Sequence, residues 1–172
     1  PFLLWCYNEP VDEMRTEIRI SVRSLVEFIL REGDLDNRIT GKADPLAMQA
    51  GSRLHRKIQK RMGAGYAAEV PLKIKVPMGE FDCVVEGRAD GIFSEDGMSW
   101  IDEIKGVYRD LGLIEKPLGV HLAQALCYAF IYASQQELPE IGVQLTYGNL
   151  ETEELKAFRE TRTREELEEW FS

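Results

Sequence analysis

Two carboxylates and a lysine lie close together in the middle of the chain. Asp90 ends one run of alternating apolar residues, and Glu103 and Lys105 lie two residues apart in the next run. A short turn separates the runs, so antiparallel pairing would bring Asp90 close to Glu103. Carboxylates that close repel each other unless a cation lies between them, and hard oxygen ligands favour Mg²⁺ or Mn²⁺. With a lysine to stabilise phosphate charge, this set suits phosphodiester hydrolysis.

The alternation of side chains along a strand decides which carboxylate belongs to this set. Neighbouring residues of a strand point to opposite faces, so Glu103 and Lys105 share one face and Asp102 lies on the other. We therefore predict that Glu103 binds metal and that Asp102 does not. Each feature also has an ordinary alternative, because Glu-x-Lys occurs on solvated strands and Asp90 could be a turn residue.

Two predicted helices carry further polar side chains of suitable types. His55 could add an imidazole ligand, which would shift the metal preference toward Mn²⁺. Gln124 and Tyr128 lie one turn apart in an apolar helix and share a face with His121. A glutamine buried there needs a hydrogen-bond partner. The alternatives are a structural histidine and a polar stripe at the edge of the core.

Hydrophobic patterns predict a mixed α/β fold that holds these residues in place. The expected elements are an N-terminal helix over 19–32 with Ser21 as N-cap, a helix from Asp44-Pro45 to Met62, strands at 70–76, 81–90 and 98–105, a helix over 117–136, a strand at 141–147 and acidic C-terminal helices within 151–172. The order of the core, about 45–148, is helix, three strands, helix, strand. We treat 1–172 as a single domain.

Composition indicates a globular protein, with 44% hydrophobic and 30% charged residues among 172. No apolar run approaches the roughly 20 residues of a membrane span, and the N-terminal stretch does not resemble a signal peptide, so we expect a cytoplasmic location and no membrane partner. The three cysteines, Cys6, Cys83 and Cys127, have no CxxC spacing. This argues against a disulfide framework or a metal cluster, and we predict that Cys83 and Cys127 are core residues.

The distribution of charge bears on a nucleic-acid partner. A net charge of −9 is unfavourable for phosphate binding, although acidity suits a site for divalent cations. Positive charge is concentrated within 52–62, in Arg53, Arg56, Lys57, Lys60 and Arg61. We expect this basic cluster to contact DNA, unless it is only a solvated helix face.

In their order along the chain, these residues resemble the PD-(D/E)xK nuclease superfamily. The matching positions are His55, Gly87-Arg-Ala-Asp90-Gly91, Asp102-Glu103-Ile-Lys105-Gly106 and Gln124-x-x-x-Tyr128. The histidine and the glutamine–tyrosine helix are similar to the RecB-like branch. The stretch around 20–36 is similar to nuclease domains fused to XPD-like DNA helicases. The resemblance covers about 45–148, and each motif is weak without the others.

The resemblance implies a restriction-endonuclease-like core and a Mg²⁺- or Mn²⁺-dependent deoxyribonuclease. It implies that the metal ligands are His55, Asp90, Glu103 and the Ile104 carbonyl, that Lys105 is the catalytic lysine, and that Gln124 and Tyr128 organise the site and the DNA strand. It also implies an exonuclease of DNA repair or recombination, acting on single strands or strand ends beside a fused or associated helicase. Ala89 stands where the superfamily name has proline, and this replacement is common in such domains. The four-cysteine iron–sulfur cluster of some relatives is absent. Without a GxxxxGK[ST] loop, any ATPase would lie outside this chain.

Two other functions stay open at this point. A catalytically weak or inactive family member would bind nucleic acid and metal without cutting. An acidic α/β interaction domain with accidental motifs would bind no metal, and its weak DNA binding would not depend on salt. The intact trio of Asp90, Glu103 and Lys105 favours an enzyme over the inactive binding module.

Overall fold

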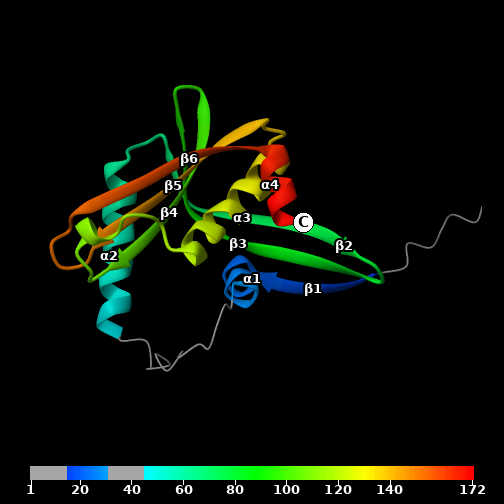
Figure 1. Cartoon of the computed structure of the whole chain (residues 1–172), viewed down its shortest axis with the longest axis horizontal. Coiled ribbons are helices and arrows are strands. Elements are labelled where there is room, and N and C mark those ends of the chain that lie inside the picture. Colours follow the sequence, from blue (N-terminus) through cyan, green and yellow to red (C-terminus); the bar gives the residue numbers. More distant parts are fainter. Residues whose placement is uncertain (1–14, 31–44) are drawn as a thin grey trace, which may run out of the picture.

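The structure, a computed structural model, describes residues 15–30 and 45–172. Within these ranges the chain forms one six-stranded mixed sheet with four α-helices and a short 3₁₀ helix (Figure 1). The elements are β1 (Thr16–Ser21), α1 (Val22–Ile29), α2 (Pro45–Arg61), β2 (Tyr66–Met78), β3 (Phe81–Glu95), β4 (Met98–Val107), η1 (Leu111–Leu113), α3 (Gly119–Gln135), β5 (Glu140–Asn149), β6 (Leu155–Thr163) and α4 (Arg164–Phe171). The strand order is β1-β3-β4-β5-β6, and β2 also pairs with β3.

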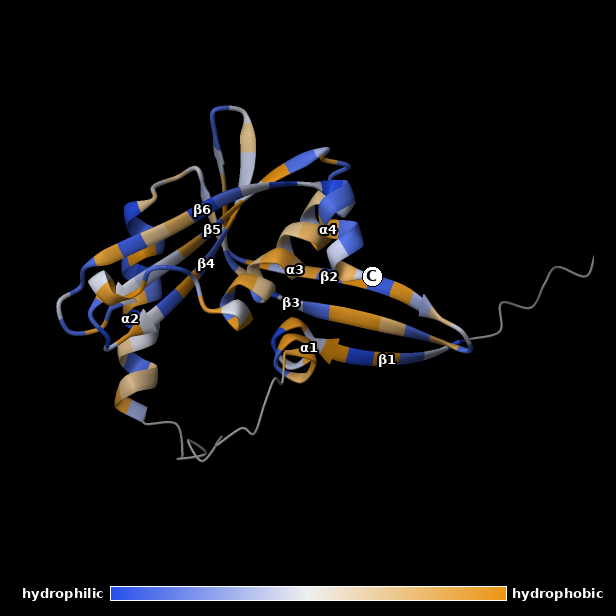
Figure 2. Ribbon diagram, in the orientation of Figure 1, coloured by the Kyte–Doolittle hydropathy of each residue, from blue (hydrophilic) through white to orange (hydrophobic). Residues whose placement is uncertain are grey.

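Helices cover the sheet on both sides, but unequally. The main core joins α1, α3 and α4 to one face of the sheet, and α3 is largely apolar along its length (Figure 2). Because β4 and β5 are parallel, a crossover must join them, and α3 provides it. On the other face, Leu54 and Ile58 of α2 pack on Ile104 of β4 in a small second cluster.

The pairing of β3 leaves a gap in the sheet. Along one edge of β3, β2 pairs with nearly the whole strand, and Pro71 and Pro77 fit its outer position because proline lacks the N–H that a second neighbour would need. Along the other edge, β1 pairs as far as Glu86 and β4 begins at Gly91. Residues 87–90 therefore pair with neither β1 nor β4.

The predicted core order is present, as α2, β2, β3, β4, α3 and β5. The prediction of an N-terminal helix over 19–32 was wrong at its start. Residues 19–21 belong to β1, which pairs in parallel with β3. The helix begins at Val22, and Ser21 is its N-cap, accepting a hydrogen bond from the Ser24 amide at 3.0 Å. Residues 31 and 32, the N-cap position Asp44 and Cys6 lie outside the described residues.

The prediction of C-terminal acidic helices over 151–172 was half wrong. Leu155–Thr163 is strand β6, which pairs antiparallel with β5, so sheet pairing overrides the charge-rich composition. Only α4 is helical, and Thr163 and Glu166 form a capping box at its start. Cys127 is buried as predicted, whereas Cys83 is only half-buried. Among the described residues, no helix is long and apolar enough to span a membrane.

Candidate metal centre

Asp90 lies at the end of the gap in the sheet, where β3 and β4 stop pairing. The Ile104 amide donates a hydrogen bond of 2.7 Å to Oδ2 of Asp90. The carboxylate thus replaces the backbone acceptor that a continued ladder would supply. The last ladder pair joins Gly91 to Asp102, so the next position of each strand carries Asp90 and Glu103. The predicted hairpin therefore brings these two residues together.

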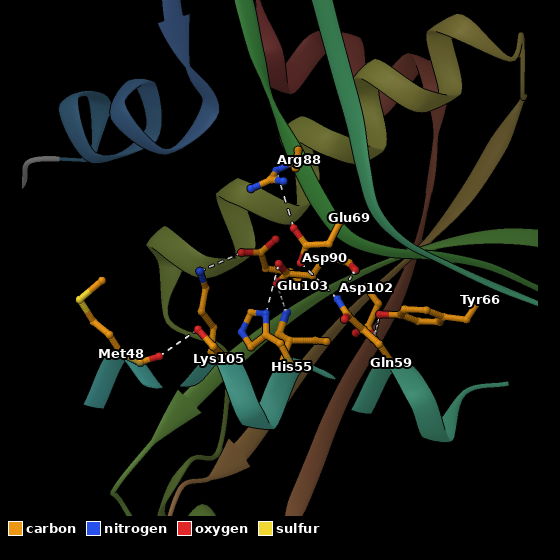
Figure 3. A network of polar contacts seen from close by, with 12 residues as sticks. Met48, His55, Gln59, Tyr66, Glu69, Arg88, Asp90, Asp102, Glu103 and Lys105 are labelled. Atoms are coloured by element: carbon orange, nitrogen blue, oxygen red, sulfur yellow. Dashed lines mark hydrogen bonds and ion pairs between the residues drawn. The ribbon is translucent and has the colours of Figure 1, made fainter. Parts of the chain in front are cut away.

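Helix α2 approaches Asp90 with two side chains one turn apart (Figure 3). Nδ1 of His55 lies 3.5 Å from Oδ1 of Asp90. Gln59 donates from Nε2 to the Asp90 carbonyl at 3.0 Å and to Oε1 of Glu69 at 3.2 Å. Burial alone would lower the pKa of His55, but the carboxylates of Asp90 and Glu103 outweigh burial and raise it. The imidazole thus lies in a negative environment.

Glu103 and Lys105 form an ion pair on the face of β4 that α3 covers. The Lys105 ammonium lies 2.8 Å from Oε1 of Glu103, and only 5% of Glu103 is exposed. Its second oxygen, Oε2, is buried and accepts no hydrogen bond from any described residue. Burial and the nearby Asp90 raise the pKa of Glu103 to about 7, although Lys105 opposes the shift. An acceptor buried without a partner is costly, so Oε2 is suited to a cation or a donor from outside the chain.

Gln124 and Tyr128 reach the same region from α3. Tyr128 packs against Gly87, where a Cβ would lie 2.6 Å from the tyrosine hydroxyl. Burial, then the charges of Glu103 and Asp90, raise the pKa of the Tyr128 hydroxyl, and the nearby Arg88 backbone opposes this shift. Gln124 is buried, and its Oε1 has no hydrogen-bond partner among the described residues. Tyr128 therefore borders the gap, and Gln124 lies one turn before it on the same buried helix.

His121 shares that helix face but has a different partner. Its Nδ1 lies 2.9 Å from the hydroxyl of Tyr147, which also accepts a hydrogen bond from the Leu118 amide. Burial and then the charge of Lys105 lower the pKa of His121 to about 4. His121 is thus a neutral residue held by Tyr147.

Glu69 also lies at the centre, and the sequence analysis missed it. Ligand atoms of Glu69, His55 and Asp90 all lie within 4.8 Å of one another. The register of β2 and β3 places Glu69 opposite Asp90, between the pairs Ala68–Gly91 and Val70–Ala89. Glu69 adopts a positive φ of 54°, which is uncommon outside glycine, and the β2–β3 ladder lacks a pair at this position although β2 continues through it. Extending the predicted hairpin backward by one residue would have identified it.

The donors at this centre fit a divalent cation. Ligand atoms of His55, Glu69 and Asp90 form one group, and Glu103 lies outside that group but close enough to raise the pKa of His55. One oxygen of Glu103 is buried without a partner among the described residues. Oxygen-rich sets of this kind suit Mg²⁺ and Mn²⁺. Of the predicted ligands, the structure brings His55 and Asp90 into this group, and Glu103 lies at the adjacent position of β4, outside the 4.8 Å group. Ile104 takes part through its amide, and the role of its carbonyl stays a prediction.

Comparisons with known proteins give a fold and no family. No family model matches the chain, and no curated protein matches it. Among solved structures, the crystal structure of SSO0001 is similar, with a TM-score of 0.56 and 22% sequence identity. The alignment covers 82% of this chain and 66% of that chain. At this identity the similarity bears on the mixed α/β fold alone.

Proposed function

We propose that the chain is a metal-dependent deoxyribonuclease of the PD-(D/E)xK superfamily, RecB-like branch, with a restriction-endonuclease-like core. The observation that supports this best is the meeting of His55, Asp90, Glu103 and Lys105 at one break in the sheet, with a buried oxygen of Glu103 left unpaired. Four residues spread over fifty positions meet there in the order and spacing that the superfamily uses.

The proposed metal ligands are His55, Asp90, Glu103 and the Ile104 carbonyl, and Glu69 is close enough to join them. A bound Mg²⁺ or Mn²⁺ would supply Lewis acidity at the scissile phosphate and lower the pKa of a water molecule beside it. The protein supplies the geometry: the Ile104 amide and Gln59 hold Asp90 on both its side chain and its carbonyl. Asp90 is thus held at two points by the protein itself.

Lys105 is the proposed catalytic lysine. Its ammonium group, held by Oε1 of Glu103, can donate to a phosphate oxygen as negative charge develops there. Hydrolysis forms a bond between a water oxygen and phosphorus and breaks the bond to one deoxyribose oxygen, which takes up a proton. Tyr128 and Gln124 would place the strand, because they border the same gap from α3.

The DNA would approach along α2. Arg53, Arg56 and Lys60 are exposed and recur at helical spacing, close to His55 on the same helix. They could neutralise phosphates that flank the scissile bond, despite the acidic charge of the whole chain. We further propose an exonuclease of DNA repair or recombination, cytoplasmic and acting on single strands or strand ends, with a helicase fused to it or associated with it.

The test uses end-labelled linear DNA and circular DNA, single- and double-stranded, with Mg²⁺, Mn²⁺ or excess chelator. We expect cleavage that requires the metal and stops with chelator, since the carboxylates have no Lewis acidity of their own. Glu103→Gln serves as the control for contaminating nucleases. Cleavage that continues in excess chelator would overturn the proposal, and metal and DNA binding without any turnover would favour the binding module.

A further inference from the structure

Asp102 is a fully buried carboxylate that faces away from the centre and accepts hydrogen bonds from two hydroxyl groups. The Tyr66 hydroxyl donates to its Oδ2 at 2.9 Å, and the Thr146 hydroxyl donates to its Oδ1 at 2.7 Å. Its exposed fraction is 0%. Burying a carboxylate is costly unless it is well hydrogen-bonded, so a stable fold alone would be served better by an apolar side chain here.

A chain of hydrogen bonds leads from Asp102 to a cation at the edge of the sheet. Arg159 donates to Oε1 of Gln144 at 2.6 Å, and Gln144 donates to the Thr146 hydroxyl at 3.1 Å. Thr146 in turn donates to Asp102, so every donor in the chain points toward the carboxylate. Hydrogen bonds aligned in one direction strengthen one another. The chain therefore stabilises a negative Asp102 and fixes the direction of its side chain.

The Tyr66 bond crosses three strands beside the candidate metal centre. Tyr66 begins β2, Asp102 lies in β4, and Gly91 of β3 lies between them (Figure 3). A Cβ at Gly91 would lie 1.8 Å from the Tyr66 ring, so the ring lies directly over that backbone. Gly91 follows Asp90, and Asp102 precedes Glu103. The contact thus ties the two strands at the last ladder pair before they separate.

We propose that Tyr66 and Asp102 are positioning residues that set the distance between the Asp90 and Glu103 carboxylates, and hence the affinity for the cation. Beyond the Gly91–Asp102 pair no ladder bond fixes the two strands, apart from the Ile104 amide on Asp90. Metal affinity depends on the spacing of the ligands. Loss of a group that orients the ligands without being one of them commonly weakens metal binding by roughly 10- to 100-fold. This inference rests on the proposed function, because it assumes that the two carboxylates bind metal.

The experiment measures Mn²⁺ dissociation constants directly, by electron paramagnetic resonance of free Mn²⁺, in the purified chain and its variants. Tyr66→Phe keeps the ring over Gly91 and removes only the hydroxyl. Thr146→Val removes the other donor at nearly constant volume, and Thr146→Ser restores it. We expect about tenfold weaker Mn²⁺ binding in Tyr66→Phe and Thr146→Val, and near wild-type binding in Thr146→Ser.

A control separates positioning from general stability. Leu167 of α4 is buried in the main core, so Leu167→Ala should lower the melting temperature and leave the side-chain hydrogen bonds of Tyr66, Thr146 and Asp102 in place. Equal Mn²⁺ affinity in wild type, Tyr66→Phe and Thr146→Val would overturn the inference and leave the proposed function standing. The same loss in Leu167→Ala at a matched melting temperature would also overturn it. A wild-type chain that binds no Mn²⁺ would overturn the proposed function itself.

Discussion

At the scale of single residues, the two oxygens of Glu103 have different partners. Oε1 pairs with Lys105, whereas Oε2 is buried without a hydrogen bond from the described residues. One carboxylate can therefore hold the lysine and still offer a free oxygen to a cation. This division is compatible with the proposed roles of Glu103 as a metal ligand and Lys105 as the catalytic lysine on one strand face.

Lys105→Ala should lower the cleavage rate by on the order of a hundredfold while metal affinity is retained. The reason is that the variant removes a donor to the phosphate and leaves every proposed ligand in place. Single-turnover rates with saturating Mn²⁺, together with a Mn²⁺ titration, provide the measurement. A wild-type rate would remove the lysine from the mechanism.

Glu103→Gln should abolish cleavage with the fold intact, because it keeps the shape of the side chain and loses the charge. Asp102→Asn should be milder, since Asp102 is buried on the other face with hydroxyl partners. Cleavage rates and circular dichroism of both variants test this. If Asp102→Asn were the inactive variant and Glu103→Gln the active one, the assignment of the strand faces to metal binding would be wrong.

His55→Ala should weaken Mn²⁺ binding more than Mg²⁺ binding, because the softer ion gains more from an imidazole. The 3.5 Å contact with Asp90 places the ring close enough to share a cation. Calorimetric titrations with each metal give the two ratios. Equal losses for both metals would identify His55 as a structural partner of Asp90.

Sequence patterns could predict part of this site and not the rest. Strand alternation suffices to place Glu103 and Lys105 on one face and Asp102 on the other, because that depends only on local geometry. Glu69 was not predicted because it precedes the alternating run that begins at Val70, and its proximity to Asp90 depends on the register of β2 with β3. The hydrogen-bond chain from Arg159 joins residues of β4, β5 and β6, so no local pattern reveals it.

At the scale of elements, the two missed strands differ: β1 pairs with the distant strand β3, whereas β6 forms a local hairpin with β5 but has a charge-rich sequence. In β1, Ile18 and Ile20 alternate with charged residues, but the helix follows at once and the two periods overlap. In β6, burial alternates residue by residue along a charged sequence, as expected for an edge strand with one face on the protein. The strands β2, β3 and β4 were easier to predict from the sequence, because short turns join them.

Two glycines provide a test of how closely the elements pack. A Cβ at Gly142 of β5 would lie 2.1 Å from the Trp100 ring, whereas one at Gly51 of α2 would meet nothing within 4 Å. Gly142→Ala should therefore destabilise the fold by about 1–3 kcal/mol through overpacking. Gly51→Ala should stabilise it by about 0.5–1 kcal/mol, because alanine is the better helix former. Denaturant unfolding measures both, and a stabilising Gly142→Ala would contradict the close packing of Trp100.

At the scale of the whole molecule, charge is the feature that most opposes a DNA partner. The net charge of −9 repels a polyanion, so binding must depend on a local positive surface. The basic cluster of α2 is only partly available, because Lys57 forms an ion pair with Glu153. Arg53, Arg56, Lys60 and Arg61 are exposed, and the first three of them recur at helical spacing around His55.

The salt dependence of DNA binding tests this surface. Neutralising Arg53, Arg56 and Lys60 together should flatten the plot of log affinity against log salt by about 1 per lost phosphate contact, thus by roughly 2–3 in all. Lys57→Ala is the matched control on the same helix; because Glu153 already neutralises Lys57, it should change the slope little. Fluorescence anisotropy with a labelled oligonucleotide, in Ca²⁺ to prevent cleavage, gives the slopes. An unchanged slope in the triple variant, or an equal change in Lys57→Ala, would place the DNA on another face of the molecule.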